Sequence, residues 1–157
     1  MFFGPTEALL GTVDGSGAGA TGNPLNWTDG CDPGNQAMGI TLNNGASVVV
    51  NVTENPALGD IEEWTIYNFT ADAPPIHLHL VRFEVLGREA IGGGESVVGP
   101  DLLPWESGYK DTVISYPGET TTVKALFDIP GLYVWHCHIV EHEDNEMMRP
   151  YYVGAAD

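Results

Sequence analysis

Hydrophobic and polar residues alternate along much of the chain, with the period of two that is typical of a half-buried β-strand. The alternation is clear over residues 61–69 and 119–127. A third run, from residue 77 to residue 86, predicts one long strand, in which Val81, Phe83 and Val85 alternate with Arg82 and Glu84. Runs of strand-forming residues predict further strands at residues 47–53, 111–115, 131–138 and 150–153.

Turn-forming residues separate these runs and fill two longer segments, at residues 14–35 and 89–108, that are rich in Gly and in Pro, Asn or Asp. No strand–helix–strand alternation is visible, so the pattern predicts an all-β, antiparallel sandwich or barrel. We expect the domain to span residues 37–157. Residues 1–36 form a Gly/Pro-rich N-terminal segment that is part of the domain or leads into it.

The 157 residues suffice for one domain with its own core. The chain has 22 acidic against 5 basic residues and a net charge of −17, which argues against nucleic acid and anionic membranes as partners and suits attraction of cations. Adaptation to high salt is one interpretation of this charge, and an ordinary solvated acidic surface is the other. The first residues lack the charged head and apolar body of a secretory signal. Either export is directed from upstream of this start, or the chain is a piece of a larger protein.

All five histidines lie in two short windows, and the second window also holds a cysteine and a methionine within twelve residues. Side chains two residues apart on a strand share a face. Both windows contain a His-x-His pair, so each pair is expected to project from one face, with the cysteine on the opposite one. The residues concerned are His77 and His79 in the first window and His136, Cys137, His138, His142 and Met147 in the second.

Two such strands lying side by side would place four imidazoles on one surface, as in a multinuclear transition-metal site. On the other face, Cys137, His142 and Met147 offer a thiolate, an imidazole and a thioether. This donor set is typical of blue copper, although such a site normally needs two histidines. The peptide from His136 to His138 would link the two sites by a short path for single electrons.

Other interpretations of these residues remain open. Hydrogen-bonded histidines beside a buried cysteine would need no metal at all. Zinc would explain the cysteine and histidines but not the spacing to Met147. Cys31 and Cys137 could pair in a disulfide, but the position of Cys137 between two histidines favours metal ligation.

Three segments resemble the last cupredoxin domain of a multicopper oxidase. Within that family, they are most similar to the group of bacterial spore-coat laccases and bilirubin oxidases. They are Pro75-Ile-His-Leu-His-Leu-Val, Tyr109-Lys-Asp-Thr-Val and the stretch from Gly131 to Pro150 with its Trp-His-Cys-His-Ile-Val-Glu-His core. The likeness covers roughly residues 50–153. It implies a Greek-key β-sandwich of the cupredoxin type and a secreted or otherwise extracytoplasmic protein.

The resemblance also implies roles for single residues. Glu143 matches an acidic residue that the family uses for proton delivery to its copper cluster; a solvated loop carboxylate is the alternative. The implied ligands are His77 for the type 2 copper, His79, His136 and His138 for the type 3 pair, and Cys137, His142 and Met147 for the type 1 copper.

The implied function is that of a laccase-like oxidase, in which one-electron oxidation of phenolic or similar small-molecule donors is coupled to reduction of O2 to water. A non-catalytic copper-binding or electron-transfer cupredoxin module is the alternative.

Two departures from the family pattern limit what this chain does alone. Pro74 stands where the family has the second histidine of the type 1 site, so we expect no strong thiolate-to-Cu(II) band unless imidazole is added. The trinuclear cluster of the family needs twice the four histidines that this chain has available for it. The other half is expected from a missing N-terminal domain, a partner chain or a second copy.

Overall fold

The computed structural model describes residues 10–12, 23–24, 36–41, 47–52, 54–93, 96, 101–144 and 147–154. Most of residues 1–36, Cys31 included, lie outside this part of the chain, so the proposed division at residue 37 stays a prediction. No helix within the described residues is long and apolar enough to span a bilayer. The elements are β1 (Gly11–Thr12), β2 (Asn23–Pro24), β3 (Gln36–Thr41), β4 (Ser47–Val52), β5 (Ile61–Tyr67), β6 (Pro75–Leu78), β7 (Phe83–Ala90), η1 (Pro104–Glu106), β8 (Thr112–Ile114), β9 (Glu119–Leu126), β10 (Gly131–Cys137), α1 (Val140–Asp144) and β11 (Met148–Val153).

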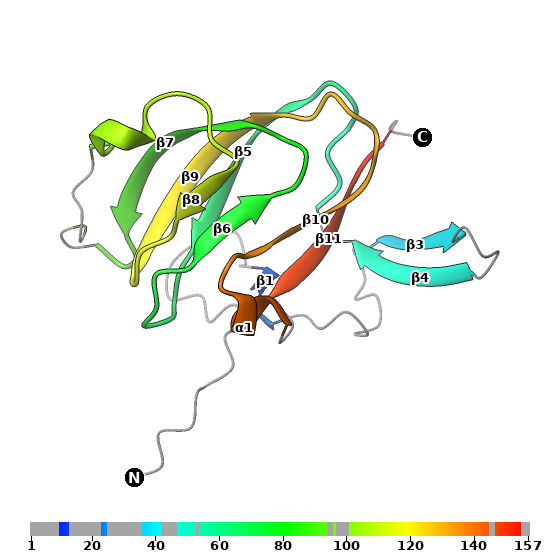
Figure 1. Cartoon of the computed structure of the whole chain (residues 1–157), viewed down its shortest axis with the longest axis horizontal. Coiled ribbons are helices and arrows are strands. Elements are labelled where there is room, and N and C mark those ends of the chain that lie inside the picture. The colour runs from blue at the N-terminus through cyan, green and yellow to red at the C-terminus, as the bar shows by residue number, and fades with distance from the viewer. Residues whose placement is uncertain are drawn as a thin grey trace, which may run out of the picture.

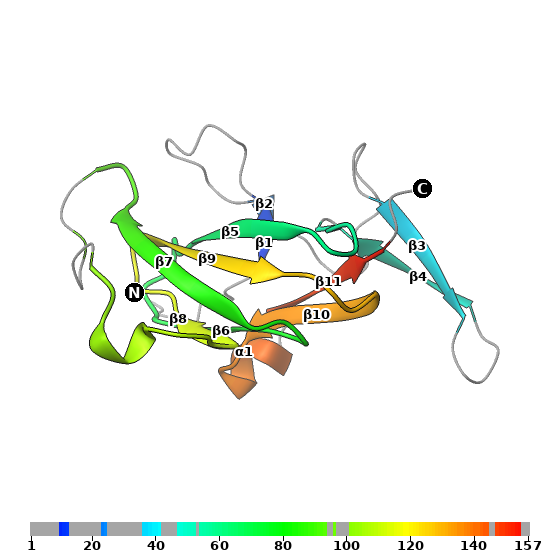
Figure 2. The ribbon, with the colours of Figure 1, turned by 90° about the horizontal axis from the view of Figure 1, so that it is seen from above.

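Two antiparallel sheets form the layers of a sandwich, which Figure 2 shows from the side. One sheet has the strand order β11-β10-β6-β8 and the other the order β5-β9-β7. The strands β3 and β4 form a separate hairpin at one end, and α1 lies beside the end of β10 (Figure 1). The predicted all-β antiparallel sandwich is therefore confirmed.

The core lies between the two sheets and follows the alternation that is visible in the sequence. On β9, every second residue from Glu119 to Ala125 is buried, while the residues between them reach the surface. The inward face of β9 carries the apolar Val123 and Ala125 toward one end and the buried polar Glu119 and Thr121 toward the other. The buried cluster contains Ile76, Leu78, Val81, Phe83, Val85, Val113, Val123, Ala125, Phe127, Trp135, Cys137, Met147, Tyr151 and Val153.

The single long strand predicted for residues 77–86 is wrong. The strand β6 ends at Leu78 and β7 begins at Phe83, and the two belong to different sheets. Between them Leu80 has a φ of 62°, in the left-handed region, which turns the chain out of the extended conformation. The apolar positions change from even to odd residue numbers at Leu80 and Val81, so the sequence carried a sign of the break that the prediction of one long strand overlooked.

A buried ion pair joins β7 to η1, and its arginine also bonds to the other sheet. The register of β7 shifts between Val85 and Gly87, and this bulge turns Arg88 toward the interior. The Arg88 guanidinium donates hydrogen bonds to both carboxylate oxygens of Glu106, one of them 2.7 Å long, and another to the carbonyl of Ile114 on β8 at 3.1 Å. These bonds from Arg88 hold the pKa of the Glu106 carboxyl below its usual range.

Candidate metal centre

Four imidazoles gather on the outer face of the β11-β10-β6-β8 sheet. The antiparallel register places His77 of β6 directly opposite His136 of β10, so both side chains leave the sheet on the same side. Their ring centroids lie 5.3 Å apart, and His79 is 4.9 Å from His77. The exposed ring of His138 is 5.3 Å from that of His136 and 5.9 Å from that of His77. The side chains of the two His-x-His motifs thus share one face of the sheet, as the sequence pattern predicts.

The nitrogen atoms of this histidine cluster are close enough to share metal ions. The Nε2 atoms of His79 and His136 lie 3.1 Å apart, and one nitrogen each from His77, His79 and His136 lie within 4.8 Å of one another. A metal–imidazole bond is about 2.0–2.1 Å long, so two nitrogens on one ion are separated by about 3–4 Å. Burial is the largest cause that lowers the pKa of His79, and the neighbouring His77 and His136 lower it further. The lowered pKa favours the neutral imidazole, which is the form that binds a metal.

Backbone carbonyls orient two of these rings. The Nδ1 atom of His77 lies 2.9 Å from the carbonyl of Asp111 and 3.0 Å from the hydroxyl of Thr112. A carbonyl only accepts, so Nδ1 carries the proton and Nε2 keeps its lone pair for a metal. The Nδ1 atom of His136 makes the equivalent bond to the carbonyl of Cys137 at 3.0 Å. The sequence reasoning assigned no role to Asp111 or Thr112, although both lie in one of the family-like segments.

The thiol of Cys137 faces the opposite way, into the core, and is fully buried and free of a disulfide. Its Sγ atom lies 3.9 Å from Nδ1 of His142 and accepts a hydrogen bond from the backbone of Ile139. The helix α1 returns His142 toward Cys137, and backbone bonds from Cys137 to Met147 and from Met147 to His142 close the loop. Burial is the main cause that raises the pKa of the Cys137 thiol.

Glu143 lies behind the ring of His136. Its Oε2 atom is 3.4 Å from Nδ1 of His136, and its side chain is about a quarter exposed. The partly exposed carboxylate therefore lies next to the histidine cluster, on the helix that also carries His142. Its predicted role in proton delivery stays a prediction.

Pro74 lies on the same side of the sheet as the Cys137 thiol. Burial alternates from Pro74 to Leu78, where residues 74, 76 and 78 are buried and residues 75 and 77 are partly exposed. Ile76 pairs with Cys137 in the register, and the side chains of residues 74 and 76 share a face. The proline ring therefore faces the side on which a further ligand to a metal at Cys137 would stand.

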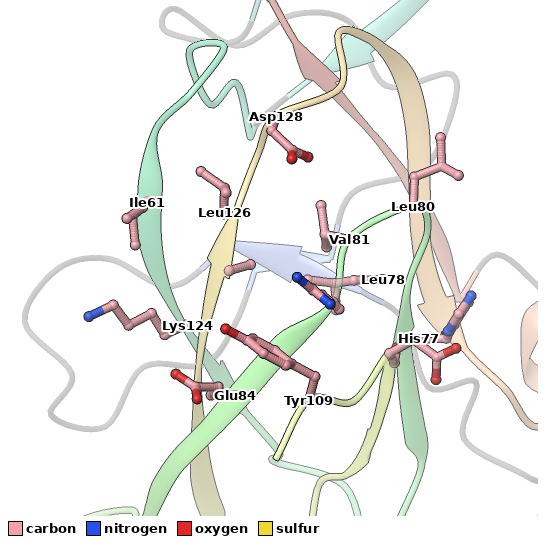
Figure 3. A pocket seen from close by; sticks show the side chains of 13 residues that line it. Ile61, His77, Leu78, Leu80, Val81, Glu84, Tyr109, Lys124, Leu126 and Asp128 are labelled. Carbon is pink, nitrogen blue, oxygen red and sulfur yellow. Dashed lines mark hydrogen bonds between the residues drawn. The ribbon is translucent and has the colours of Figure 1, made fainter.

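A groove of about 650 Å³ runs beside His77, where the chain crosses from one sheet to the other (Figure 3). The side chains of Leu80 and Tyr109 in its lining are each 60% exposed, and the Arg82 guanidinium lies 4.4 Å from the centre of the Tyr109 ring. Arg82 and Lys124 line the groove, and Lys110 follows Tyr109 in the chain. The other two basic residues of the chain, Arg88 and Arg149, are buried. Glu84, Asp111 and Asp128 line the same groove, so its lining carries charges of both signs and no excess of positive charge.

Comparison with known proteins places this geometry in a family. A family model described as multicopper oxidase matches residues 19–157. A laccase from Bacillus stratosphericus is 50% identical over 110 residues, which cover 63% of this chain and 21% of that protein. A laccase from Haloferax volcanii is 46% identical over 99 residues, which cover 62% of this chain and 16% of the relative. The solved structure of the McoA multicopper oxidase from Aquifex aeolicus is 34% identical and has a TM-score of 0.58, covering 68% of this chain and 22% of that one.

The chain belongs to the multicopper oxidase family. It is a copper-binding domain of a laccase-like oxidase, with the cupredoxin-like β-sandwich that the sequence resemblance implied. It spans about a fifth of the length of the first curated relatives that it matches.

Proposed function

We propose that this chain contributes one half of a trinuclear copper cluster, with His77 as a ligand of the type 2 copper and His79, His136 and His138 as ligands of the type 3 pair. The observation that carries the proposal is the gathering of four imidazoles from β6 and β10 on one face of one sheet. Copper bound there would supply the one-electron redox chemistry that reduction of O2 requires.

The residues around the cluster have roles that follow from their contacts. Asp111 and Thr112 hold His77 in the tautomer that leaves Nε2 free. Glu143, whose carboxylate is 3.4 Å from Nδ1 of His136, would relay protons between solvent and the cluster. In the complete oxidase, four one-electron oxidations of a phenolic or similar donor would balance one O2, which takes up four electrons and four protons to give two waters. We include an extracytoplasmic location in this proposal.

The remaining cluster ligands would come from a further domain of the same oxidase, docked over the groove beside His77. The chain spans only about a fifth of its curated relatives, which leaves room for such a domain. The groove is continuous with the histidine cluster through His77, and its exposed Leu80 and Tyr109 are suited to an interface core. Arg82 and Lys124, with Glu84, Asp111 and Asp128 in the same lining, would form charge pairs of both signs with the partner.

Copper titration of the purified chain tests the ligand assignment. We expect His77→Ala and His136→Ala each to lower the copper content measured by elemental analysis and to change the Cu(II) EPR signal. The matched control is His142→Ala on α1, on the side of β10 that carries Cys137, which should leave the Cu(II) EPR signal of the histidine cluster in place. Copper content unchanged in both cluster variants would contradict the proposal.

Light scattering tests the docking partner. With the separate remainder of a full-length relative added, we expect a complex that Arg82→Glu weakens and that high salt weakens further. If the copper-loaded chain instead doubles its mass by itself, and Arg82→Glu prevents this, the occupant of the groove is a second copy rather than another domain.

A non-catalytic copper-binding or electron-transfer module is the second candidate, and Pro74 favours it because the donor set at Cys137 lacks one imidazole. Oxygen consumption with a phenolic dye separates the two candidates. Turnover by the copper-loaded assembly that His136→Ala abolishes supports the oxidase. Copper binding without turnover supports the module.

A further inference from the structure

The donor set around Cys137 does not fit a complete type 1 copper site. Pro74 is buried on the Cys137 side of the sheet, and its ring offers no lone pair to a metal. Its carbonyl already accepts the backbone N–H of Ser115 at 3.0 Å. Among the described residues, Cys137 belongs to no group of three His, Cys, Asp or Glu donors within 4.8 Å of one another. Within the part of the chain that the structure describes, a second imidazole is therefore missing from this site.

Among the described residues three donors are left, and they are soft or intermediate in character. The Sγ atom of Cys137 and Nδ1 of His142 lie 3.9 Å apart, a separation that one ion spans with bonds of about 2.0–2.3 Å. Met147 is 3% exposed and belongs to the same buried cluster as Cys137. Its backbone is fixed by hydrogen bonds to both other residues. The thiolate, imidazole and thioether thus come from one closed loop.

We infer that Cys137, His142 and Met147 form a site that retains Cu(I) and discriminates against Cu(II). Thiolate and thioether ligands select Cu(I), a closed-shell ion that three donors satisfy, whereas Cu(II) favours four or more ligands in which nitrogen and oxygen predominate. The apolar surroundings of a fully buried Cys137 also disfavour the higher charge of Cu(II). This inference deepens the proposed function and rests on it, since it assumes a chain that is loaded with copper.

The two metal sites of the chain would then differ in the oxidation state that they hold. The histidine cluster on the outer face offers nitrogen donors, which accept Cu(II). The site on the inner face would hold one copper in the reduced state. The substitution that separates this arrangement from a complete type 1 site is the proline at position 74.

The first experiment measures Cu(I) affinity at the Cys137 site alone. The background variant carries Cys31→Ser, His77→Ala and His136→Ala, which removes the other thiol and weakens the histidine cluster. Cu(I), added without oxygen as its acetonitrile complex, competes with bathocuproine disulfonate as the optical probe. We expect the background protein to bind about one equivalent of Cu(I) tightly. Cys137→Ser should weaken this binding more than about 100-fold, which exceeds the effect of changing a residue that only contacts a ligand. Binding that survives Cys137→Ser would overturn the inference.

The second experiment restores the missing ligand. Cu(II) added to the same background should give no intense thiolate-to-copper band, and Pro74→His should produce one. If Pro74→His does not fold, Pro74→Ala with added imidazole replaces it, because removal of the ring leaves space for a free ligand. An intense band in the background protein without Pro74→His or imidazole would refute the inference. So would a Cu(II) complex there that depends on Asp72, the other carboxylate besides Glu143 that acts on the Cys137 thiol.

The outcomes distinguish this inference from the proposed function. Loss of copper from the histidine cluster in His77→Ala and His136→Ala tests the proposed function alone. The Cu(I) competition and the band in Pro74→His are measured after that cluster has been disabled. The Cu(I) inference can therefore fail while the proposed role of the histidine cluster holds, and the reverse is also possible.

Discussion

The ion pair between Arg88 and Glu106 allows a prediction about stability whose size follows from burial. Glu106→Gln keeps the shape of the side chain but removes its charge. The Arg88 side chain is 1% exposed and that of Glu106 8%, so the guanidinium would be left buried beside a neutral amide. Removal of one partner from a buried pair costs about 3–5 kcal/mol. We expect about 3 kcal/mol, because the amide oxygen still accepts one bond and the carbonyl of Ile114 another.

The same pair predicts how stability depends on pH. The pKa of Glu106 is lowered in the folded state by the bonds from Arg88. Its contribution is therefore fully present above the ordinary glutamate pKa of about 4.3 and is lost as the pH falls through the lowered value. The stability difference between the wild type and Glu106→Gln should be constant at neutral pH and shrink as the pH falls below about 4.

Urea unfolding, followed by far-UV circular dichroism at pH 7 and pH 3, measures both effects. The matched control is Glu89→Gln, an exposed carboxylate on β7, whose effect is expected within about 0.5 kcal/mol. Copper binding is a second readout, because Arg88 also bonds to β8, the strand that carries Thr112 beside His77. If Glu106→Gln destabilises the protein no more than Glu89→Gln does, the reasoning from burial is wrong.

Three further substitutions test individual contacts. Leu80→Gly should leave stability unchanged or raise it by up to about 1 kcal/mol in urea unfolding, because the left-handed φ costs leucine about 1–2 kcal/mol and the freer unfolded glycine offsets about half of this. Thr112→Val should weaken copper binding at the histidine cluster about 10-fold in calorimetry, because the ring of His77 keeps only one carbonyl partner. Tyr151→Phe should destabilise the fold by about 1–3 kcal/mol, because the carbonyl of His79 loses the buried phenol donor. Burial raises the pKa of Tyr151, so this last cost should stay constant up to about pH 10.

Matching substitutions elsewhere serve as controls for these three. Leu86→Gly, on the surface of β7, should cost about 0.5–1 kcal/mol, because that residue has no left-handed backbone to relieve. Thr120→Val on β9 should not alter copper binding. Tyr67→Phe on β5 should change stability by less than about 0.5 kcal/mol. Equal effects at a test position and its control would contradict the assigned contact.

The local alternation predicted the inward faces of the strands well, because side-chain parity depends only on neighbouring residues. It did not yield the break between Leu78 and Phe83, although the apolar positions shift by one residue at Leu80 and Val81, where the chain changes sheets. It also did not predict Arg88, which by parity belongs on the surface of β7. A bulge reverses its direction, and its buried partner comes from η1.

By itself, the sequence determined the types of donor atoms, their parity along each strand, the acidic charge and the absence of a histidine at Pro74. Only the tertiary structure decided which strands lie side by side. It placed β6 against β10, so that His79 and His136, 57 residues apart in the chain, meet at 3.1 Å. It also brought β8 to the other edge of β6, where the carbonyl of Asp111 orients His77. Strand pairing over such distances is set by the packing of the whole core, and no local pattern specifies it.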